Sequence, residues 1–148
     1  MLKVLIAEDE LLIADLLEEA LTSNGYEVCG IARTVDEAVA LAERHQPDLA
    51  ILDVRLAGGG HGPDIIRRLN NRGKMGVLYA SGGDFRMSPL TLAEGDAILA
   101  KPYRTVDAVR ALAVVRELMI DRTATPPLPS GLRLLSEAIA PPTPAFAR

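Results

Sequence analysis

The chain has 148 residues, enough for one domain with a proper hydrophobic core and little else. Its formal net charge of −4 argues against a nucleic-acid-binding surface, and its single cysteine, Cys29, excludes an intramolecular disulfide. No run approaches the roughly 18 apolar residues of a membrane span, and the N-terminal residues lack a charged leader. The sequence therefore predicts a cytoplasmic protein that contacts neither nucleic acid nor membrane.

Short apolar runs typical of β-strands recur along the first 120 residues. The predicted strands cover residues 3–7, 27–32, 49–53, 76–81 and 97–101. Residues 49–53 are continuously apolar up to the final aspartate, as expected for a strand buried on both faces of a parallel sheet.

Helical patterns separate these strands. Thr34 and Glu37 form a capping-box signature for the second helix, and Pro63 suits the first turn of the third. Residues 82–96 leave room only for a short or irregular fourth helix, and a fifth is expected from Thr105 to about Ile120. The alternation predicts an α/β fold, a doubly wound, flavodoxin-like parallel sheet of five strands in the order 2-1-3-4-5.

The composition changes after residue 120. Six of the ten prolines fall between Pro126 and Pro144, so this part cannot form a packed output domain. The sequence predicts a domain of residues 1–120 and a proline-rich C-terminal tail of residues 121–148. Within the tail, residues 131–140 either form one or two amphipathic helical turns docked on the body or remain disordered.

The last predicted helix is apolar around much of its circumference. One face must pack on the sheet, and the rest exceeds what a monomer usually exposes. Either the tail covers this surface, or a partner protein or a second copy does, so a homodimer through the fourth and fifth helices is one prediction.

Polar side chains are expected at the carboxyl ends of four strands. Glu8 and Asp9 follow the first, whereas Asp53, Ser81 and Lys101 end the third, fourth and fifth. In this strand order, ligands bind beyond the ends of strands one and three, where the acids would meet. Clustered carboxylates are tolerated mainly when a cation lies among them, and hard oxygen ligands favour Mg²⁺. An aspartate that attacks phosphorus gives an acyl phosphate, whose charge Mg²⁺ and the lysine would neutralise while the serine hydroxyl donates to a phosphate oxygen.

The ordered set Glu8-Asp9, Asp53, Ser81 and Lys101-Pro102 resembles the receiver domain of two-component response regulators, over residues 1 to about 120. The resemblance implies that Asp53 accepts a phosphoryl group from a histidine kinase or histidine phosphotransfer protein. The resemblance also implies that Lys101 and Ser81 contact the phosphoryl group. The implied metal site consists of Glu8, Asp9, Asp53 and the backbone carbonyl of Arg55. The resemblance further implies a Lys-Pro bond that is often cis.

The implied function is a phosphorylation-dependent switch. It signals through protein contacts with an unspecified downstream partner, or serves as a phosphate relay or sink. It is not an enzyme beyond its own phosphorylation and dephosphorylation.

Three features depart from the usual receiver pattern. Ile98 occupies the position of the usual switch aromatic, three residues before the lysine. The loop after Asp53 has Ala57 in place of a common proline and an apparent extra residue. Residues 79–83 (YASGG) are similar to the F-A-T-G-Y pattern of a subgroup of single-domain regulators with an unusual fourth helix.

Two other functions compete with this one. A phosphatase of the haloacid-dehalogenase type needs a second acid two residues after its nucleophile, and here that position is Arg55. A pseudo-receiver that is never phosphorylated and acts only as a docking module is the remaining alternative, and the intact set of acids, serine and lysine argues against it.

Overall fold

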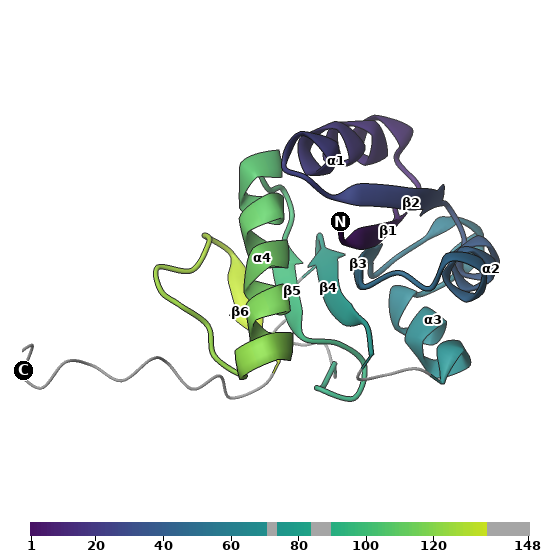
Figure 1. Ribbon diagram of the computed structural model, residues 1–148. Coiled ribbons are helices and arrows are strands. Elements are labelled where there is room, and N and C mark those ends of the chain that lie inside the picture. Colours follow the sequence, from purple (N-terminus) through teal and green to yellow (C-terminus); the bar gives the residue numbers. More distant parts are fainter. Residues whose placement is uncertain (71–73, 84–89, 136–148) are drawn as a thin grey trace, which may run out of the picture.

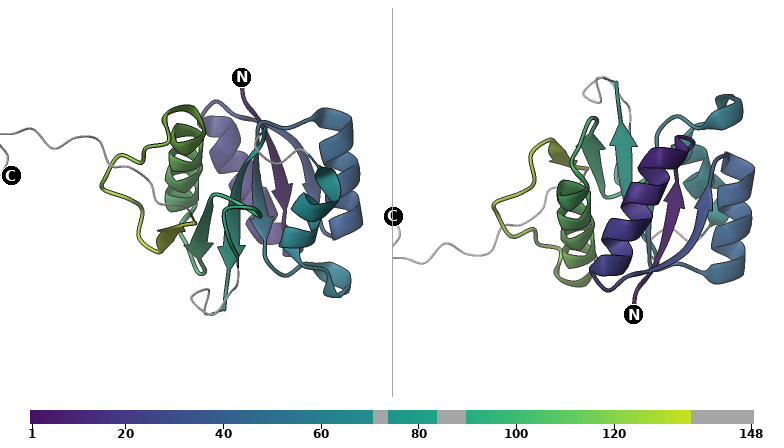
Figure 2. Two further views of the ribbon diagram at one scale, coloured as in Figure 1. Left: turned by 90° about the horizontal axis from the view of Figure 1, so that it is seen from below. Right: turned by 90° about the horizontal axis from the view of Figure 1, so that it is seen from above.

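A single twisted sheet with helices on both faces forms the body of the protein (Figures 1 and 2). The computed structural model describes residues 1–70, 74–83 and 90–135. No helix within these ranges is long and apolar enough to cross a membrane.

Among the described residues, six strands form the sheet, in the order β2-β1-β3-β4-β5-β6. They are β1 (Lys3–Ala7), β2 (Glu27–Ala32), β3 (Leu49–Asp53), β4 (Gly76–Ser81), β5 (Ala97–Ala100) and β6 (Leu132–Leu134). The first five are parallel and stand in the predicted order, so the doubly wound α/β fold is confirmed. The predicted strand number was wrong by one, because β6 adds to the edge of β5 in the antiparallel sense.

In the described part of the chain, four α-helices and one short 3₁₀ turn connect the strands. They are α1 (Leu11–Ser23), α2 (Val35–His45), η1 (Ala57–Gly59), α3 (Gly62–Leu69) and α4 (Thr105–Asp121). One half of the predicted capping box at α2 is present, because the hydroxyl of the N-cap residue Thr34 accepts the Glu37 N–H. The Glu37 carboxylate accepts the N–H of Arg33, one residue before the N-cap. The helix labelled α4 is the fifth and last helix of the sequence prediction.

The predicted fourth helix falls in a stretch that the structure describes only in part. Residues 82–83 and 90–96 form bends and a turn and contain no helix, and residues 84–89 lie outside the described residues. The turn is held by the Thr91 hydroxyl, which donates to the Glu94 carboxylate over 2.6 Å.

Two apolar layers lie on opposite faces of the sheet. The first joins the sheet to α2 and α3 and includes Ala38, Ile65 and Tyr79. The second joins the opposite face to α1 and α4 and includes Leu17 and Leu112. Because both faces are covered, β3 and β4 are buried almost throughout, which explains their uninterrupted apolar sequences.

The segment after α4 folds back along that helix before it joins the sheet (Figure 1). The Thr125 hydroxyl donates to the Glu117 carboxylate over 2.6 Å, and half-buried leucines of β6 pack beside α4. Part of the apolar surface predicted on the last helix is thus covered by the chain itself. The helical turns expected over residues 131–140 are not present in the described part, because residues 132–134 form β6; residues 136–140 lie outside the described residues.

Candidate functional site

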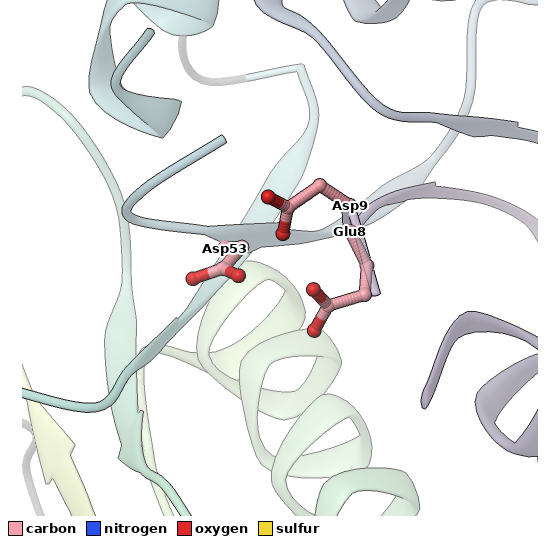
Figure 3. Close-up of side chains that lie close together, drawn as sticks. All are labelled: Glu8, Asp9 and Asp53. Carbon is pink, nitrogen blue, oxygen red and sulfur yellow. The ribbon is translucent and has the colours of Figure 1, made fainter. Parts of the chain in front are cut away.

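Three carboxylates meet at the carboxyl ends of β1 and β3. Glu8 and Asp9 follow β1 directly, and Asp53 is the last residue of β3. One carboxylate oxygen from each lies within 4.8 Å of the others, and Figure 3 shows the three side chains grouped around a common space. Sequence reasoning therefore identified a cluster that the structure does bring together.

Strand register explains why residues 45 positions apart meet. In the parallel pairing of β1 with β3, Ala7 lies opposite Leu52, so the next residues on the two strands, Glu8 and Asp53, leave the sheet side by side. The Glu8 N–H donates to the Ala32 carbonyl of β2 over 2.9 Å, which keeps the backbone extended at this point.

The Lys101 side chain crosses from β5 to the acids. Its Nζ lies 2.9 Å from Asp53 Oδ2 and 3.0 Å from Glu8 Oε1. The Glu8 side chain is only 3% exposed and that of Lys101 is 18% exposed, so these ion pairs are largely withdrawn from water. Paired charges at such depth are stable only with hydrogen bonds of this kind, since an isolated buried carboxylate is costly.

The surroundings shift the titration of both partners of this ion pair. Burial raises the pKa of Glu8, against the opposing effects of the Glu10 N–H and the Lys101 ammonium. Burial by itself would lower the pKa of Lys101, but the hydrogen bonds to Asp53 and Glu8 outweigh it and hold that pKa above its ordinary value. The lysine therefore keeps its positive charge throughout the neutral pH range.

Glu8 does more than cap α1. The N-cap of this helix is Glu10, and its side chain makes no capping hydrogen bond. Glu8 Oε2 accepts the Glu10 N–H over 3.1 Å, while its other oxygen binds Lys101. A purely capping role would leave the lysine contact unexplained.

The loop after Asp53 turns tightly around the carboxylate. The Arg55 N–H donates to Asp53 Oδ1 over 3.3 Å, and Arg55 forms an isolated antiparallel bridge with His61. Gly58 adopts a left-handed φ of 78°, which glycine tolerates without strain. The loop thereby holds the backbone of Arg55 beside the acids; a metal-binding role for its carbonyl stays a prediction.

Gly62 is a site-positioning residue that sequence reasoning missed. It begins α3, and a Cβ at this position would collide with the backbone carbonyl oxygen of Asp53. The only signal in the sequence was one more glycine in a glycine-rich loop, which does not distinguish a close contact from an ordinary turn.

Ser81 and Lys101 are joined through the backbone at the ends of β4 and β5. The Lys101 N–H donates to the Ser81 carbonyl over 2.8 Å, and the Ser81 hydroxyl accepts the Gly83 N–H over 3.4 Å. The peptide bond between Lys101 and Pro102 is cis, as the resemblance implied.

Ile98 is buried in the layer under α2 and α3, 1% exposed. It lies opposite Tyr79 in the pairing of β4 with β5. Tyr79 is fully buried and its hydroxyl donates to the Glu94 carbonyl over 2.6 Å. An aromatic side chain is therefore present at this level of the sheet, but on β4 rather than β5.

A pocket of about 420 Å³ opens next to the acid cluster, between α1 and the segment that follows β5. Its lining includes Ile13 and Leu16 of α1 together with Lys101, Pro102 and Tyr103. The Tyr103 hydroxyl is buried without a hydrogen-bond partner among the described residues, and burial raises its pKa to about 12. The pocket thus connects the charged site to an apolar surface.

The sequence of the chain is similar to those of two bacterial regulatory proteins. The chain is 56% identical over 54 residues to the transcriptional regulatory protein PdtaR of Mycobacterium tuberculosis, covering 36% of this chain and 26% of that protein. It is 35% identical over 103 residues to the phyllosphere-induced regulator PhyR of Methylorubrum extorquens, covering 69% of this chain and 39% of that regulator. The chain therefore spans between about a quarter and two fifths of the length of these curated relatives.

The structure resembles solved receiver domains as well. A CheY-like response regulator receiver domain protein from Methanospirillum hungatei aligns with a TM-score of 0.68 and 28% identity, over 80% of this chain and 94% of that structure. The response regulator receiver domain family itself matches residues 4–113. The chain belongs to the response regulator receiver domain family of two-component signalling.

Proposed function

We propose that the protein is a phosphorylation switch in which Asp53 accepts a phosphoryl group. The observation that carries this proposal is the position of the Lys101 ammonium, 2.9 Å from Asp53 and 3.0 Å from Glu8, beside a third acid, Asp9. When Asp53 carries a phosphoryl group, the Lys101 ammonium can remain in the site and bind a phosphoryl oxygen instead of the Asp53 carboxylate oxygen.

The same acids fit a divalent cation, and we propose Mg²⁺. Three carboxylates whose oxygens converge within 4.8 Å repel one another, and Lys101 neutralises only part of that charge. Asp9, Asp53 and the Arg55 carbonyl would hold the ion, with Glu8 binding a coordinated water. The ion would supply charge neutralisation for the oxygens of the transferred phosphoryl group.

The chain's own residues perform the transfer. An Asp53 carboxylate oxygen forms the new O–P bond while the N–P bond of a phosphohistidine donor breaks, and the leaving imidazole takes up a proton. Lys101 exchanges its bond to Asp53 for one to the phosphoryl group, and the Ser81 hydroxyl turns from Gly83 to donate to a second phosphoryl oxygen. Attack by water on phosphorus then breaks the O–P bond to Asp53, releases inorganic phosphate and returns the switch to its resting state.

The phosphodonor has an apolar surface beside the site on which to dock. Leu12 and Leu16 of α1 are 74% and 49% exposed, and Val106 at the start of α4 is 51% exposed. Leu16 also lines the pocket that reaches Lys101. Exposed leucines at helical spacing suit packing against a helix of a histidine kinase or histidine phosphotransfer protein.

The output we propose is a change in protein contacts, or passage of the phosphoryl group along a relay or into a sink, within the cytoplasm. The receiver unit comprises residues 1–120, and residues 121–148 are an appended segment. No reaction beyond the protein's own phosphorylation and dephosphorylation is assigned to it. A homodimer would have to use parts of the α4 surface that the appended segment leaves uncovered.

Intact-mass spectrometry tests the proposal. The folded chain is incubated with phosphoramidate or acetyl phosphate and Mg²⁺, and a single added phosphate is expected. Asp53→Asn and addition of a chelator should each abolish the adduct. Asp64→Asn is the matched control, because Asp64 is a half-exposed acid of α3 paired with Arg67 and its replacement should leave phosphorylation unchanged. A folded wild-type chain that takes up no phosphate would instead favour the docking-module alternative.

A further inference from the structure

The C-terminal strand and the proposed phosphorylation site share β5. The Ala100 N–H donates outward to the Gly131 carbonyl at the start of the β6 segment over 3.0 Å. The next residue, Lys101, donates its N–H inward to the Ser81 carbonyl of β4 over 2.8 Å. One peptide unit therefore separates the hydrogen bond that anchors the C-terminal segment from the residue that contacts Asp53.

The pairing of β6 with β5 is short. β6 has three residues, against the five or six of an average strand, and the Leu135 N–H closes its far end by donating to the Asp96 carbonyl over 2.9 Å. The preceding connection contains Pro126, Pro127 and Pro129, which have no N–H to add to the sheet. Segments with so few backbone bonds and half-exposed side chains open at low free-energy cost.

β6 covers an apolar face of α4 and pairs with the edge of β5. Without β6, this face would be exposed and the backbone groups of that edge would lack strand partners. Leu132 and Leu134 pack against Val114 and Leu118 of α4, together with Ala124. Figure 1 shows this yellow-green segment passing around α4 to reach the edge of β5. Without it, one face of α4 and the outer edge of β5 would be open to another chain.

We propose that residues 129–135 are a covering strand that phosphorylation of Asp53 loosens, exposing the β5 edge and the α4 face to an extended segment of a partner protein. The proposal rests on the proposed function of Asp53. The partner segment has the chemistry of β6 itself, an extended backbone with apolar side chains at alternate positions, because that is what the covered surface accommodates.

The route from the phosphoryl group to the strand is physical. Lys101 binds two carboxylate oxygens in the resting state, and a phosphoryl group on Asp53 requires its ammonium to move. Because the backbone of Lys101 continues directly into Ala100, that movement strains the hydrogen bond from Ala100 to Gly131. Loss of one bond from such a short pairing shifts the equilibrium toward the open segment.

Amide hydrogen exchange measured by NMR tests the proposal on the full chain. With phosphoramidate and Mg²⁺, the Ala100 and Leu135 amides should exchange about fivefold faster or more. The Glu27 amide, bonded to the Leu2 carbonyl at the opposite edge of the sheet, is the internal control and should not change. Intact mass is recorded on the same samples.

Amide exchange tests the covering strand, and intact mass tests Asp53 as phosphoacceptor, so the failure of one proposal can be distinguished from the failure of the other. A phosphorylated chain in which Leu135 exchanges at an unchanged or slower rate overturns the covering strand but leaves Asp53 as phosphoacceptor. A folded chain that gains no phosphate overturns both.

A disulfide staple gives an independent test in the reverse direction. Ala97 and Leu134 lie directly opposite each other on β5 and β6, so Ala97→Cys with Leu134→Cys can lock the strand in a Cys29→Ser background. Coupling between two sites is reciprocal, so the oxidised protein should bind beryllofluoride, a phosphoryl mimic, about fivefold more weakly than the same protein when reduced. Cys29→Ser alone should show no redox effect. Equal affinity of the stapled protein in both states contradicts the proposal.

Discussion

Lys101 and Asp53, which lie 48 positions apart in the chain, are joined by a hydrogen bond of 2.9 Å at the carboxyl ends of β5 and β3. The same ammonium reaches Glu8, so one cation links three strands of the sheet at their ends. This arrangement makes the lysine both a part of the proposed phosphorylation site and a structural tie.

Replacing Lys101 by methionine should therefore affect both properties. We expect phosphorylation by phosphoramidate to slow at least about tenfold, because the phosphoryl oxygens lose the Lys101 ammonium and keep only the proposed Mg²⁺. Without Mg²⁺, the free energy of unfolding should fall by about 2 kcal/mol, less than for a fully buried pair because Lys101 is 18% exposed. Urea denaturation in the presence of a chelator measures the second effect.

Lys74→Met is the control for loss of one positive charge, since Lys74 is exposed and lies just before β4, away from the acids. It should leave both the phosphorylation rate and the urea midpoint unchanged. If Lys101→Met phosphorylates at the wild-type rate, the proposed role of the ammonium is wrong.

Alkaline pH should destabilise the protein through Tyr103 and Lys101. Burial raises the pKa of Tyr103 from 10.0 to about 12, so between these values the unfolded chain loses a proton that the folded chain keeps. Lys101, whose pKa is also raised, contributes stability that is complete below its ordinary pKa of 10.5 and lost as pH rises further. Both groups thus lower the free energy of unfolding from about pH 10 upward.

Tyr103→Phe isolates the first contribution. At pH 7 this variant should be as stable as the wild type or more stable, by up to about 1 kcal/mol, because it removes a buried hydroxyl that has no partner among the described residues. Above pH 10 its stability should fall less steeply than that of the wild type. Tyr26→Phe, at a half-buried tyrosine just before β2, is the control for loss of one tyrosine hydroxyl. If the stability curves of the wild type and Tyr103→Phe are parallel above pH 10, the Tyr103 hydroxyl does not contribute to the alkaline loss of stability.

Gly62→Ala should disturb the acid site through the backbone. The new methyl group would overlap the Asp53 carbonyl oxygen, so α3 or the end of β3 must shift. We expect a loss of about 1–3 kcal/mol in stability and slower phosphorylation. Gly83→Ala is the matched control, since a Cβ at that position meets nothing within 4 Å. Thermal denaturation of the two variants side by side decides the question.

The sequence was sufficient for those parts of the structure that depend on periodicity and strand order. The parallel order of the first five strands and the meeting of Glu8, Asp9, Asp53 and Lys101 follow from short apolar runs separated by helices. Positions at strand ends carry this information because parallel strands bring their carboxyl ends to one edge.

Other parts depend on contacts that leave no local pattern. β6 has three residues in a proline-rich segment, and its pairing with β5 is decided by distant side chains on α4. The role of Gly62 depends on the path of the neighbouring backbone, which a glycine in a loop does not reveal. For the same reason the sequence could not show which groups surround Ile98.

The surroundings of Ile98 give the last prediction. Ile98 stands where receivers usually have a switch aromatic, yet it is 1% exposed and lies opposite the fully buried Tyr79. Restoring an aromatic residue by Ile98→Tyr would place a second ring in a layer that is already filled, and overpacking of this kind costs about 1–3 kcal/mol. We therefore expect the variant to unfold at lower urea concentration, whereas Ile98→Val, which only removes a methylene group, should cost about 1 kcal/mol. If Ile98→Tyr is as stable as the wild type, the layer has room for an aromatic side chain and the position can still operate as an ordinary switch.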